Sequence, residues 1–336
     1  MKRIFTAVGF LLALSLSGPG AAAKQSQPPG RLVDLGGHRL HVYCTGHGSP
    51  TVVVEAGLAD FSFDWILVQR QVARFTRVCT YDRSGYAFSD PGPQPRTYAQ
   101  INLELHDALR KLGERPPLVL VGHSFGGGVV RHYAAQYPDE TAGIVLADAV
   151  SEEERIPMGK KAMRVRDSAT GRTIPQPHEA MLVSDRSLRK AGSSEPAPTK
   201  LEPPFDRLPL EEQRMQLWAY AQPELRAAVQ SEIEWSPEDL LLMHNTPQAG
   251  VLGHRPLIVL TRAEGGYGND LGVPAAKLEQ ERRATQAELA RLSTESRQIV
   301  IASGHNMELE APDQVTSAIR EVVEQVRRRT DCADGR

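Results

Sequence analysis

Short apolar runs alternate with segments of helical periodicity along most of the chain. The runs include TVVVEAG at residues 51–57, TRVCTYD at residues 76–82 and GIVLADAV at residues 143–150. Each is continuous enough for a strand that is buried on both faces. Strands that alternate with helices at this spacing predict an α/β fold, in which a mostly parallel, twisted sheet of about eight strands carries helices on both faces.

The helical segments are also bounded by recognisable signals. In INLELHDALRKLG, the side chains of Ile101, Leu105, Leu109 and Leu112 share one helical face, and Gly113 provides a stop. Near the start of the chain, RLVDLGG and HRLHVYCTG predict two strands joined by a Gly-Gly turn. A final helix is expected from Asp313 to about Arg328, followed by a polar tail over residues 329–336.

Residues 151–250 interrupt the alternation and contain no convincing buried strand. The first half of this segment is polar and rich in Pro, Gly and Ser, whereas the second half has helical spacing. A long insertion inside an α/β domain is most often a lid or a functional loop. We therefore expect a core formed by residues 24–150 and 251–328, with residues 151–250 inserted as a helical cap.

The N-terminal residues have the features of a secretory signal peptide. Lys2 and Arg3 precede a short apolar run, and small residues follow it up to Ala23. The run is too short to span a membrane. We expect cleavage near residue 23 and export to the periplasm or medium, without stable membrane insertion.

Composition narrows the range of partners. The chain has 336 residues, of which 40% are hydrophobic and 24% charged, as in an ordinary soluble domain. Its formal net charge of -2 and the lack of a basic stripe argue against a nucleic-acid partner. Oligomeric state is left open.

The clearest chemical signal is GHSFG, at residues 122–126. This is a G-x-S-x-G sequence that directly follows a predicted buried strand, PPLVLVGHS, and directly precedes a predicted helix. A serine on such a sharp turn needs small neighbours, and the helix N-terminus beneath it favours developing negative charge. We identify Ser124 as the candidate nucleophile.

From about Leu40 to Val326, the chain resembles the α/β-hydrolase superfamily. The resemblance implies that the loop in VVVEAGLADFSFDW supplies an oxyanion donor, the Leu58 N–H, which acts together with the Phe125 N–H. YDRSGYAFSD is similar to a D-R-x-G-x-G-x-S segment of esterases and peptidases, with Ala87 in place of the second glycine. Asp82 and Arg83 in that segment are expected to be ion-paired structural supports.

The general base is expected late in the chain. ASGHNMELEAPDQV contains Gly304-His305 followed by Glu310-Ala311-Pro312, which is similar to a G-H-x-x-x-x-E-x-P sequence of the superfamily. Histidine suits this role because its pKa lets it take the serine proton and return it to the leaving group near neutral pH. His305 is the candidate base, and surface or packing roles fit the other histidines better.

Two carboxylates remain open as the acid that orients His305. Asp148 follows the strand in GIVLADAV, and Glu264 follows the strand in PLIVLTRAE. Most of the superfamily uses the later position, but TRAEGGYGND lacks the usual turn there. Both residues satisfy the required chain order, and we favour Asp148.

The resemblance also implies a pairing for two of the three cysteines. It places the second strand, with Cys44, beside the fourth strand, with Cys79, so a cross-strand disulfide is reasonable in an exported protein. Cys332, in the polar tail, would then be free. The spacing of Cys and His is unlike that of a zinc site, and we predict neither a metal nor a cofactor.

The sequence thus predicts an exported serine hydrolase that acts on a small-molecule ester or amide. Carboxylic-ester cleavage through an acyl-enzyme is the first hypothesis. The second is another chemistry on the same triad: aminopeptidase, amidase or carbon–carbon bond hydrolase. Dehalogenases and epoxide hydrolases of the superfamily carry Asp at the elbow, so Ser124 argues against them. A non-catalytic binding protein is a third hypothesis, against which the intact Ser124 and His305 argue.

Overall fold

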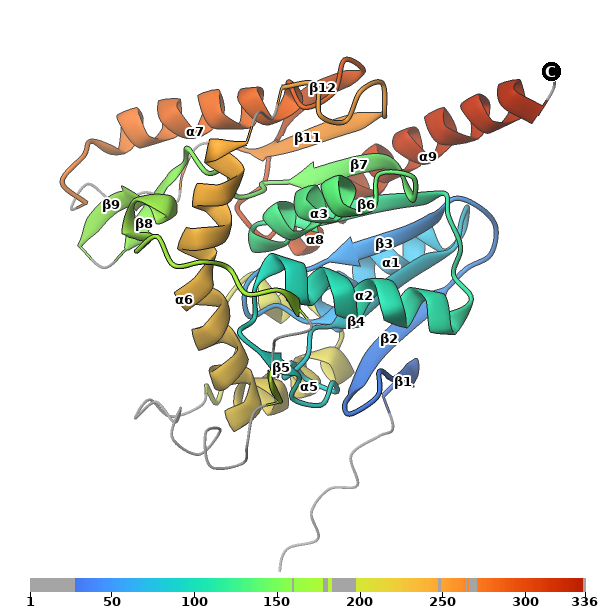
Figure 1. The fold of residues 1–336 in the computed structure, drawn as a ribbon, viewed down its shortest axis with the longest axis horizontal. Coiled ribbons are helices and arrows are strands. Elements are labelled where there is room, and N and C mark those ends of the chain that lie inside the picture. Colours follow the sequence, from blue (N-terminus) through green and yellow to red (C-terminus); the bar gives the residue numbers. More distant parts are fainter. Residues whose placement is uncertain are drawn as a thin grey trace, which may run out of the picture.

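The structure, a computed structural model, describes residues 28–158, 160–177, 181–182, 198–246, 249–263, 265 and 271–334. The predicted signal peptide, residues 1–23, lies outside this part of the chain. Figure 1 shows a central sheet with helices packed on its two faces.

Eight strands form the central sheet, as predicted, in the order β1-β2-β4-β3-β6-β7-β11-β12. They are β1 (Arg31–Asp34), β2 (Arg39–Thr45), β3 (Thr51–Glu55), β4 (Val78–Asp82), β6 (Leu118–His123), β7 (Thr141–Ala147), β11 (Leu257–Arg262) and β12 (Ser296–Ile301). β2 is antiparallel to its neighbours β1 and β4, whereas the pairs from β4 through β12 are parallel. The parallel arrangement brings the carboxyl ends of these strands to one edge of the molecule.

The two faces of the sheet bury two separate hydrophobic clusters. One cluster lies under α2 (Tyr98–Leu112), α3 (Phe125–Gln136) and α7 (Ala275–Ala290). The other lies under α1 (Ile66–Val72), α8 (Met307–Glu310) and α9 (Pro312–Asp334). Strand β6 contributes Leu118 and Leu120 to the first cluster and Val119 and Val121 to the second. This alternation explains why the predicted strands are apolar at every position.

Helix boundaries follow local capping. The side chain of Thr97 accepts a hydrogen bond from the Gln100 N–H at the start of α2, and Gly113 ends the helix with φ 77°. At the C-terminus, α9 continues past the expected end at Arg328 to Asp334. The segment RRRTDCAD contains neither Gly nor Pro to stop the helix. Exposed Cys332 therefore lies on a helix rather than in an irregular tail.

Residues 151–250, predicted to be an insertion and called the inserted segment below, combine small antiparallel pairs with helices. β8 (Arg155–Met158) pairs with β9 (Lys161–Arg164), and β10 (Met181–Leu182) pairs with β5 (Pro93–Gln94). Single 3-10 turns occur at Val165–Ser168 and Phe205–Arg207, and another, Ser62–Trp65, precedes α1 in the core. The predicted helical half forms α5 (Leu210–Tyr220) and α6 (Pro223–Asn245). In Figure 1, α6 stands across the edge toward which β3 and β7 point.

Two further features bear on the predicted export. Cys44 on β2 and Cys79 on β4 are direct cross-strand partners with Cα atoms 4.0 Å apart, and they form the predicted disulfide. Within the described residues, no helix has the length and apolarity needed to cross a membrane.

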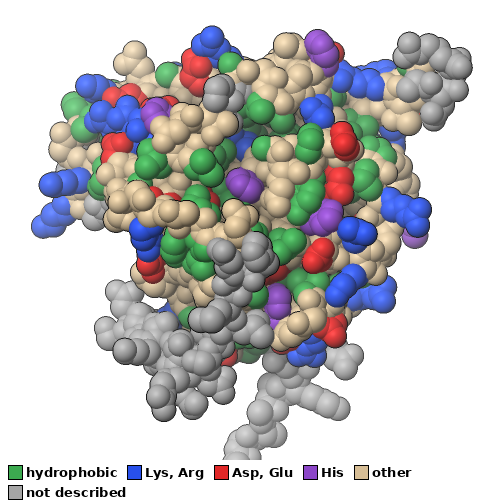
Figure 2. All heavy atoms as spheres, viewed as in Figure 1, with side chains coloured by type: hydrophobic (Ala, Val, Ile, Leu, Met, Phe, Trp, Pro, Cys, Tyr) green, Lys and Arg blue, Asp and Glu red, His purple; other side chains and the backbone are tan. Residues whose placement is uncertain are grey.

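On the face drawn in Figure 2, acidic and basic side chains are interspersed.

Candidate active site

Ser124 lies on a strained turn between β6 and α3. Its backbone has φ 51° and ψ −121°, a region that residues other than glycine rarely adopt. The turn is held in place because the Ser124 N–H donates to the Ala147 carbonyl on β7 and the Ser124 carbonyl accepts from the Val150 N–H. The predicted sharp turn at the end of a buried strand is confirmed.

The glycines on either side of Ser124 allow close backbone approach. A Cβ at Gly126 would collide with the Glu55 carbonyl oxygen at the end of β3, and a Cβ at Gly122 would lie 2.6 Å from the Gly126 carbonyl oxygen. Any larger residue at either position would push α3 away from the sheet. The G-x-S-x-G spacing is therefore explained by packing at this turn.

Ser124, His305 and Asp148 form one chain of hydrogen bonds. The Ser124 hydroxyl lies 3.0 Å from His305 Nε2, and His305 Nδ1 lies 2.7 Å from Asp148 Oδ2. Because a carboxylate only accepts, His305 Nδ1 carries a proton, which leaves Nε2 of the neutral ring free to accept the serine proton. The three side chains follow β6, β12 and β7, and the parallel sheet brings these strand ends together. Their catalytic roles remain predictions.

Asp148 is buried among cations. It follows β7 with φ 40°, and its carboxylate accepts from Arg262 and from Arg282, the latter at 3.2 Å. Burial alone would raise the pKa of Asp148, but the His305 hydrogen bond and the Arg262 charge outweigh it and hold the pKa below its usual value. The carboxylate is thus kept ionised beside the imidazole. The alternative acid, Glu264, lies outside the described residues.

The two predicted oxyanion donors lie on the turn after β3 and at the start of α3. Phe125 is the first residue of α3, so its N–H points out of the helix without an intrahelical acceptor. Leu58 lies on the turn after β3, where the Asp60 N–H donates to the Gly57 carbonyl at 3.2 Å. The side chains of Leu58 and Phe125 belong to one apolar cluster, which also contains Leu240 and Met243 of α6. The inserted segment therefore packs directly against the predicted oxyanion residues.

His123 links three loops of the site, a role that sequence reasoning did not anticipate. It is buried, its Nδ1 lies 3.3 Å from Asp60 Oδ2, and its Nε2 lies 2.9 Å from the His305 carbonyl oxygen. Both partners are acceptors, so both ring nitrogens carry protons. Burial lowers the pKa of His123, but the Glu308 charge and the Asp60 hydrogen bond outweigh it and raise the pKa to about 9. The charged ring ties the elbow to the loops that carry Leu58 and His305.

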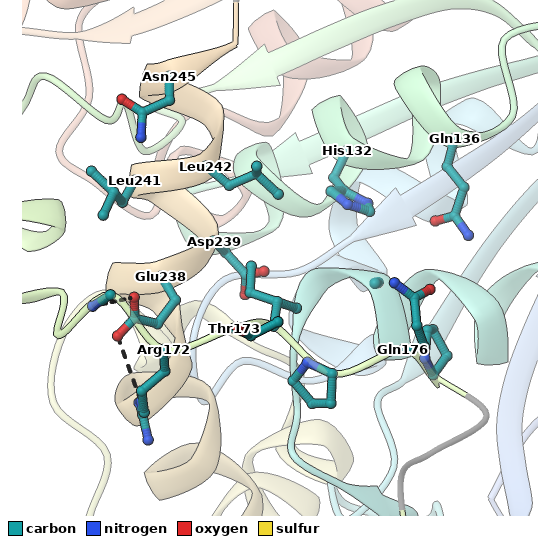
Figure 3. A pocket seen from close by; sticks show the side chains of 15 residues that line it. His132, Gln136, Arg172, Thr173, Gln176, Glu238, Asp239, Leu241, Leu242 and Asn245 are labelled. Carbon is teal, nitrogen blue, oxygen red and sulfur yellow. Dashed lines mark hydrogen bonds and ion pairs between the residues drawn. The ribbon is translucent and has the colours of Figure 1, made fainter.

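A separate pocket of about 610 Å³ lies between α2, α3, α6 and the segment around Thr173. Figure 3 shows Asp239 and Leu242 of α6 on one side of it and His132 of α3 on the other. Of the described residues that line the pocket, none belongs to the hydrogen-bonded chain of Ser124. Asp239 is almost fully buried, and its carboxyl accepts a hydrogen bond from the Tyr98 N–H at 3.1 Å.

Asp239 should make the folded protein less stable as pH rises. Burial raises its pKa to about 8, so the folded state holds a proton that the unfolded chain releases near pH 4. The stabilisation is fully present below the unfolded pKa and is lost as pH rises through about 8. Between pH 5 and 8, this effect should lower the free energy of unfolding of the wild type by up to about 1.4 kcal/mol per pH unit. The Asp239→Asn variant should lack this decrease, which denaturant titration at several pH values would measure.

The control for this test is Asp206→Asn, which changes an exposed carboxylate in the same inserted segment. This variant should keep the wild-type dependence on pH. Equal slopes for wild type and Asp239→Asn would contradict the prediction.

Comparison with known proteins agrees with this architecture. A family model described as alpha/beta hydrolase fold matches residues 50–206. The protein YbdG of Bacillus subtilis (strain 168) is 28% identical over 121 residues, which are 35% of this chain and 37% of that protein. The chain therefore spans well under two thirds of that relative's length.

Solved structures match over nearly the whole chain. A thermophilic esterase from Thermogutta terrifontis is 22% identical, with a TM-score of 0.57, and the match covers 88% of this chain and 97% of that one. The epoxide hydrolase CorEH is 14% identical, with the same TM-score of 0.57, over 88% of this chain and 98% of that one. At such identities the likeness establishes the fold, and proteins with one fold can differ in their chemistry.

Proposed function

Because this chain has the α/β-hydrolase fold, we propose that it is a serine hydrolase that cleaves carboxylic esters through an acyl-enzyme. The observation that carries the proposal is the hydrogen-bonded chain from Ser124 Oγ through His305 to Asp148. A serine hydroxyl is a weak nucleophile on its own and needs an adjacent base, itself oriented by a third group. The distances of 3.0 Å and 2.7 Å suit that role.

In the proposed reaction, Ser124 Oγ attacks the ester carbonyl carbon while His305 Nε2 takes the hydroxyl proton. The carbonyl oxygen becomes an oxyanion, which accepts hydrogen bonds from the N–H groups of Leu58 and Phe125. Collapse of this intermediate breaks the ester C–O bond, and His305 gives its proton to the departing alkoxide. Water then attacks the acyl-enzyme by the same route and releases the acid. Ionised Asp148 stabilises the imidazolium formed in each half of the cycle.

The side chains around the nucleophile favour an apolar acyl group. Leu58, Val150 and Val165 are half-buried and belong to the apolar cluster that contains Phe125. The tryptophans of the inserted segment contact other groups: Trp218 stacks on Phe88, and Trp235 lies under the Arg172 guanidinium. We therefore assign the acyl contacts to the cluster around Leu58 rather than to these tryptophans.

Epoxide hydrolysis, the activity in the name of one structural neighbour, is disfavoured by the residue at the elbow. That branch of the superfamily carries Asp where this chain has Ser124, because its nucleophile is a carboxylate. We also propose that the chain is exported by way of residues 1–23. The disulfide between Cys44 and Cys79 supports this, since such bonds persist in oxidising compartments.

The test uses the full chain, processed by its host or begun at residue 24. Hydrolysis of p-nitrophenyl acetate, butyrate, octanoate and laurate would be compared with that of anilide and aminoacyl-anilide substrates. The same protein would be labelled with a fluorophosphonate, and the labelled peptide would be located by mass spectrometry. We expect ester turnover and a label on Ser124. Preference for aminoacyl anilides would indicate a peptidase instead, and absence of both turnover and label would refute the hydrolase proposal.

A further inference from the structure

Arg83 is held by an unusually complete set of acceptors beside the turn that carries Leu58. A guanidinium has five N–H donors in one plane. Arg83 Nε donates to Glu232 Oε1 at 2.9 Å. Nη1 donates to Glu55 Oε1 at 2.7 Å and to the Ala56 carbonyl at 2.9 Å. Nη2 donates to the Gly57 carbonyl at 2.7 Å and to Glu232 Oε2 at 3.3 Å. All five donors are used, so the orientation of the group is fixed.

The bond from Arg83 to the Gly57 carbonyl determines the direction of the Leu58 N–H. The two belong to one peptide unit, which is planar and trans, so its C=O and N–H point in opposite directions. A guanidinium that holds the carbonyl on one side aims the N–H to the other. The charge also polarises the amide, which makes its N–H a stronger donor. The Arg83 guanidinium further lies 5.1 Å from the centre of the Phe125 ring, beside the second predicted donor.

Glu232 joins this arrangement to the inserted segment. It lies on α6, is fully buried, and accepts from Arg83 through both carboxylate oxygens. The Tyr86 hydroxyl donates to the same carboxylate and accepts from the Ala59 N–H at 3.3 Å. Through Arg83 and Tyr86, one carboxylate on α6 thus reaches three backbone groups of the turn: the Ala56 and Gly57 carbonyls and the Ala59 N–H.

Two carboxylates contact the Arg83 guanidinium: Glu232 pairs with two of its nitrogens, and Glu55 pairs with one. Burial raises the pKa of Glu55, although the Arg83 charge and the hydrogen bond from the Tyr81 hydroxyl act against this shift. Without the Glu232 charge, buried Arg83 would keep a single ionic hydrogen bond among the described residues, the one to Glu55. An unbalanced buried cation is costly, and the guanidinium would move or draw in water to find another partner.

We propose that Glu232 is a positioning residue for the oxyanion hole, acting through Arg83 on the peptide between Gly57 and Leu58 and through Tyr86 on the same turn at Ala59. The inference rests on the proposed function. It assigns α6 a second role besides packing on the site: the oxyanion donor is aimed at Ser124 only while α6 is docked on the core.

The test is Glu232→Gln, which keeps the size of the side chain but loses its charge and one acceptor. Its amide N–H₂ would face the N–H groups of Arg83. We expect kcat for p-nitrophenyl butyrate to fall roughly 10- to 100-fold, below the 10²- to 10³-fold typical when an oxyanion donor is removed outright. KM should change less than about threefold, because the Leu58 N–H on this turn binds mainly the oxyanion, which forms only after Ser124 attacks the ester. Affinity for phenylboronic acid, which forms a tetrahedral adduct on serine, should fall by the same factor as kcat.

Glu234→Gln is the matched control, since Glu234 lies on the same helix but pairs with Arg172 at the surface. It should keep wild-type kcat and boronate affinity. If Glu232→Gln does not fold, Tyr86→Phe serves as the test instead. It removes the hydroxyl that joins Glu232 to the Ala59 N–H and does not change a charge. It should lower kcat and boronate affinity together by several-fold.

Two results would overturn the inference. If the wild type hydrolyses esters but Glu232→Gln behaves as Glu234→Gln does, or if the deciding Tyr86→Phe variant is indistinguishable from wild type, the positioning role is wrong and the hydrolase proposal stands. If the wild type neither turns over ester nor takes the fluorophosphonate label, both proposals fail.

Discussion

Replacing Ser124 with alanine is expected to lower kcat for ester hydrolysis by about 10⁶-fold, because removal of a triad nucleophile leaves only the oxyanion donors and substrate binding. Alanine retains the Cβ, so it meets the same backbone demand at φ 51° as serine does. The fold should therefore persist, and a change in Tm would be small. Initial rates with p-nitrophenyl butyrate and labelling by fluorophosphonate measure the effect, and labelling should disappear.

A matched control for this variant is Ser317→Ala, which removes an exposed hydroxyl that donates to the Asp313 carbonyl on α9. It should retain wild-type turnover and labelling. If Ser124→Ala kept more than a few per cent of the wild-type rate, the nucleophile would have to be another residue, and the labelled peptide would identify it.

The fold could be predicted because its signals are local. TVVVEAG and GIVLADAV are apolar at successive positions, which only a strand covered on both faces tolerates, and the structure buries every residue of β3. The helix ending at Gly113 had a stop signal inside the same short segment. The end of α9 was predicted less well, because the charged residues after Arg328 suggested a tail although none of them prevents a helix.

Only those residues of the candidate site that lie within a sequence motif could be predicted with certainty of position. Ser124 and His305 each lie in a characteristic stretch of sequence. The acid does not, since Asp148 and Glu264 both follow a strand. The hydrogen bond between His305 and Asp148, whose backbone has φ 40°, is seen only in the structure. The supports of the site were harder still. Arg83 was expected to be ion-paired, but its partner Glu232 is 149 residues away on an inserted helix, a distance that no local pattern spans.

Asp148→Asn is expected to lower kcat by about 10⁴-fold with little change in KM. The asparagine amide can turn its N–H₂ toward His305 Nδ1, which forces the ring proton onto Nε2. Nε2 then faces Ser124 Oγ as a donor and can no longer accept the hydroxyl proton. The variant also removes a charged partner of Arg262 and Arg282, so kcat must be compared at a temperature well below the Tm of the variant.

Two comparisons separate this role from general destabilisation. Glu279 accepts from Arg282 at 2.9 Å, as Asp148 does at 3.2 Å, but makes no hydrogen bond to His305 among the described residues. Glu279→Gln should therefore keep kcat within about tenfold of wild type, an effect below about 1.4 kcal/mol. Glu264→Gln tests the other acid directly. A large loss in Glu264→Gln together with a small loss in Asp148→Asn would reverse the assignment. Equal small losses would mean that neither carboxylate orients His305, since a buried acid in this position stabilises the imidazolium in both half-reactions and its removal must slow each of them.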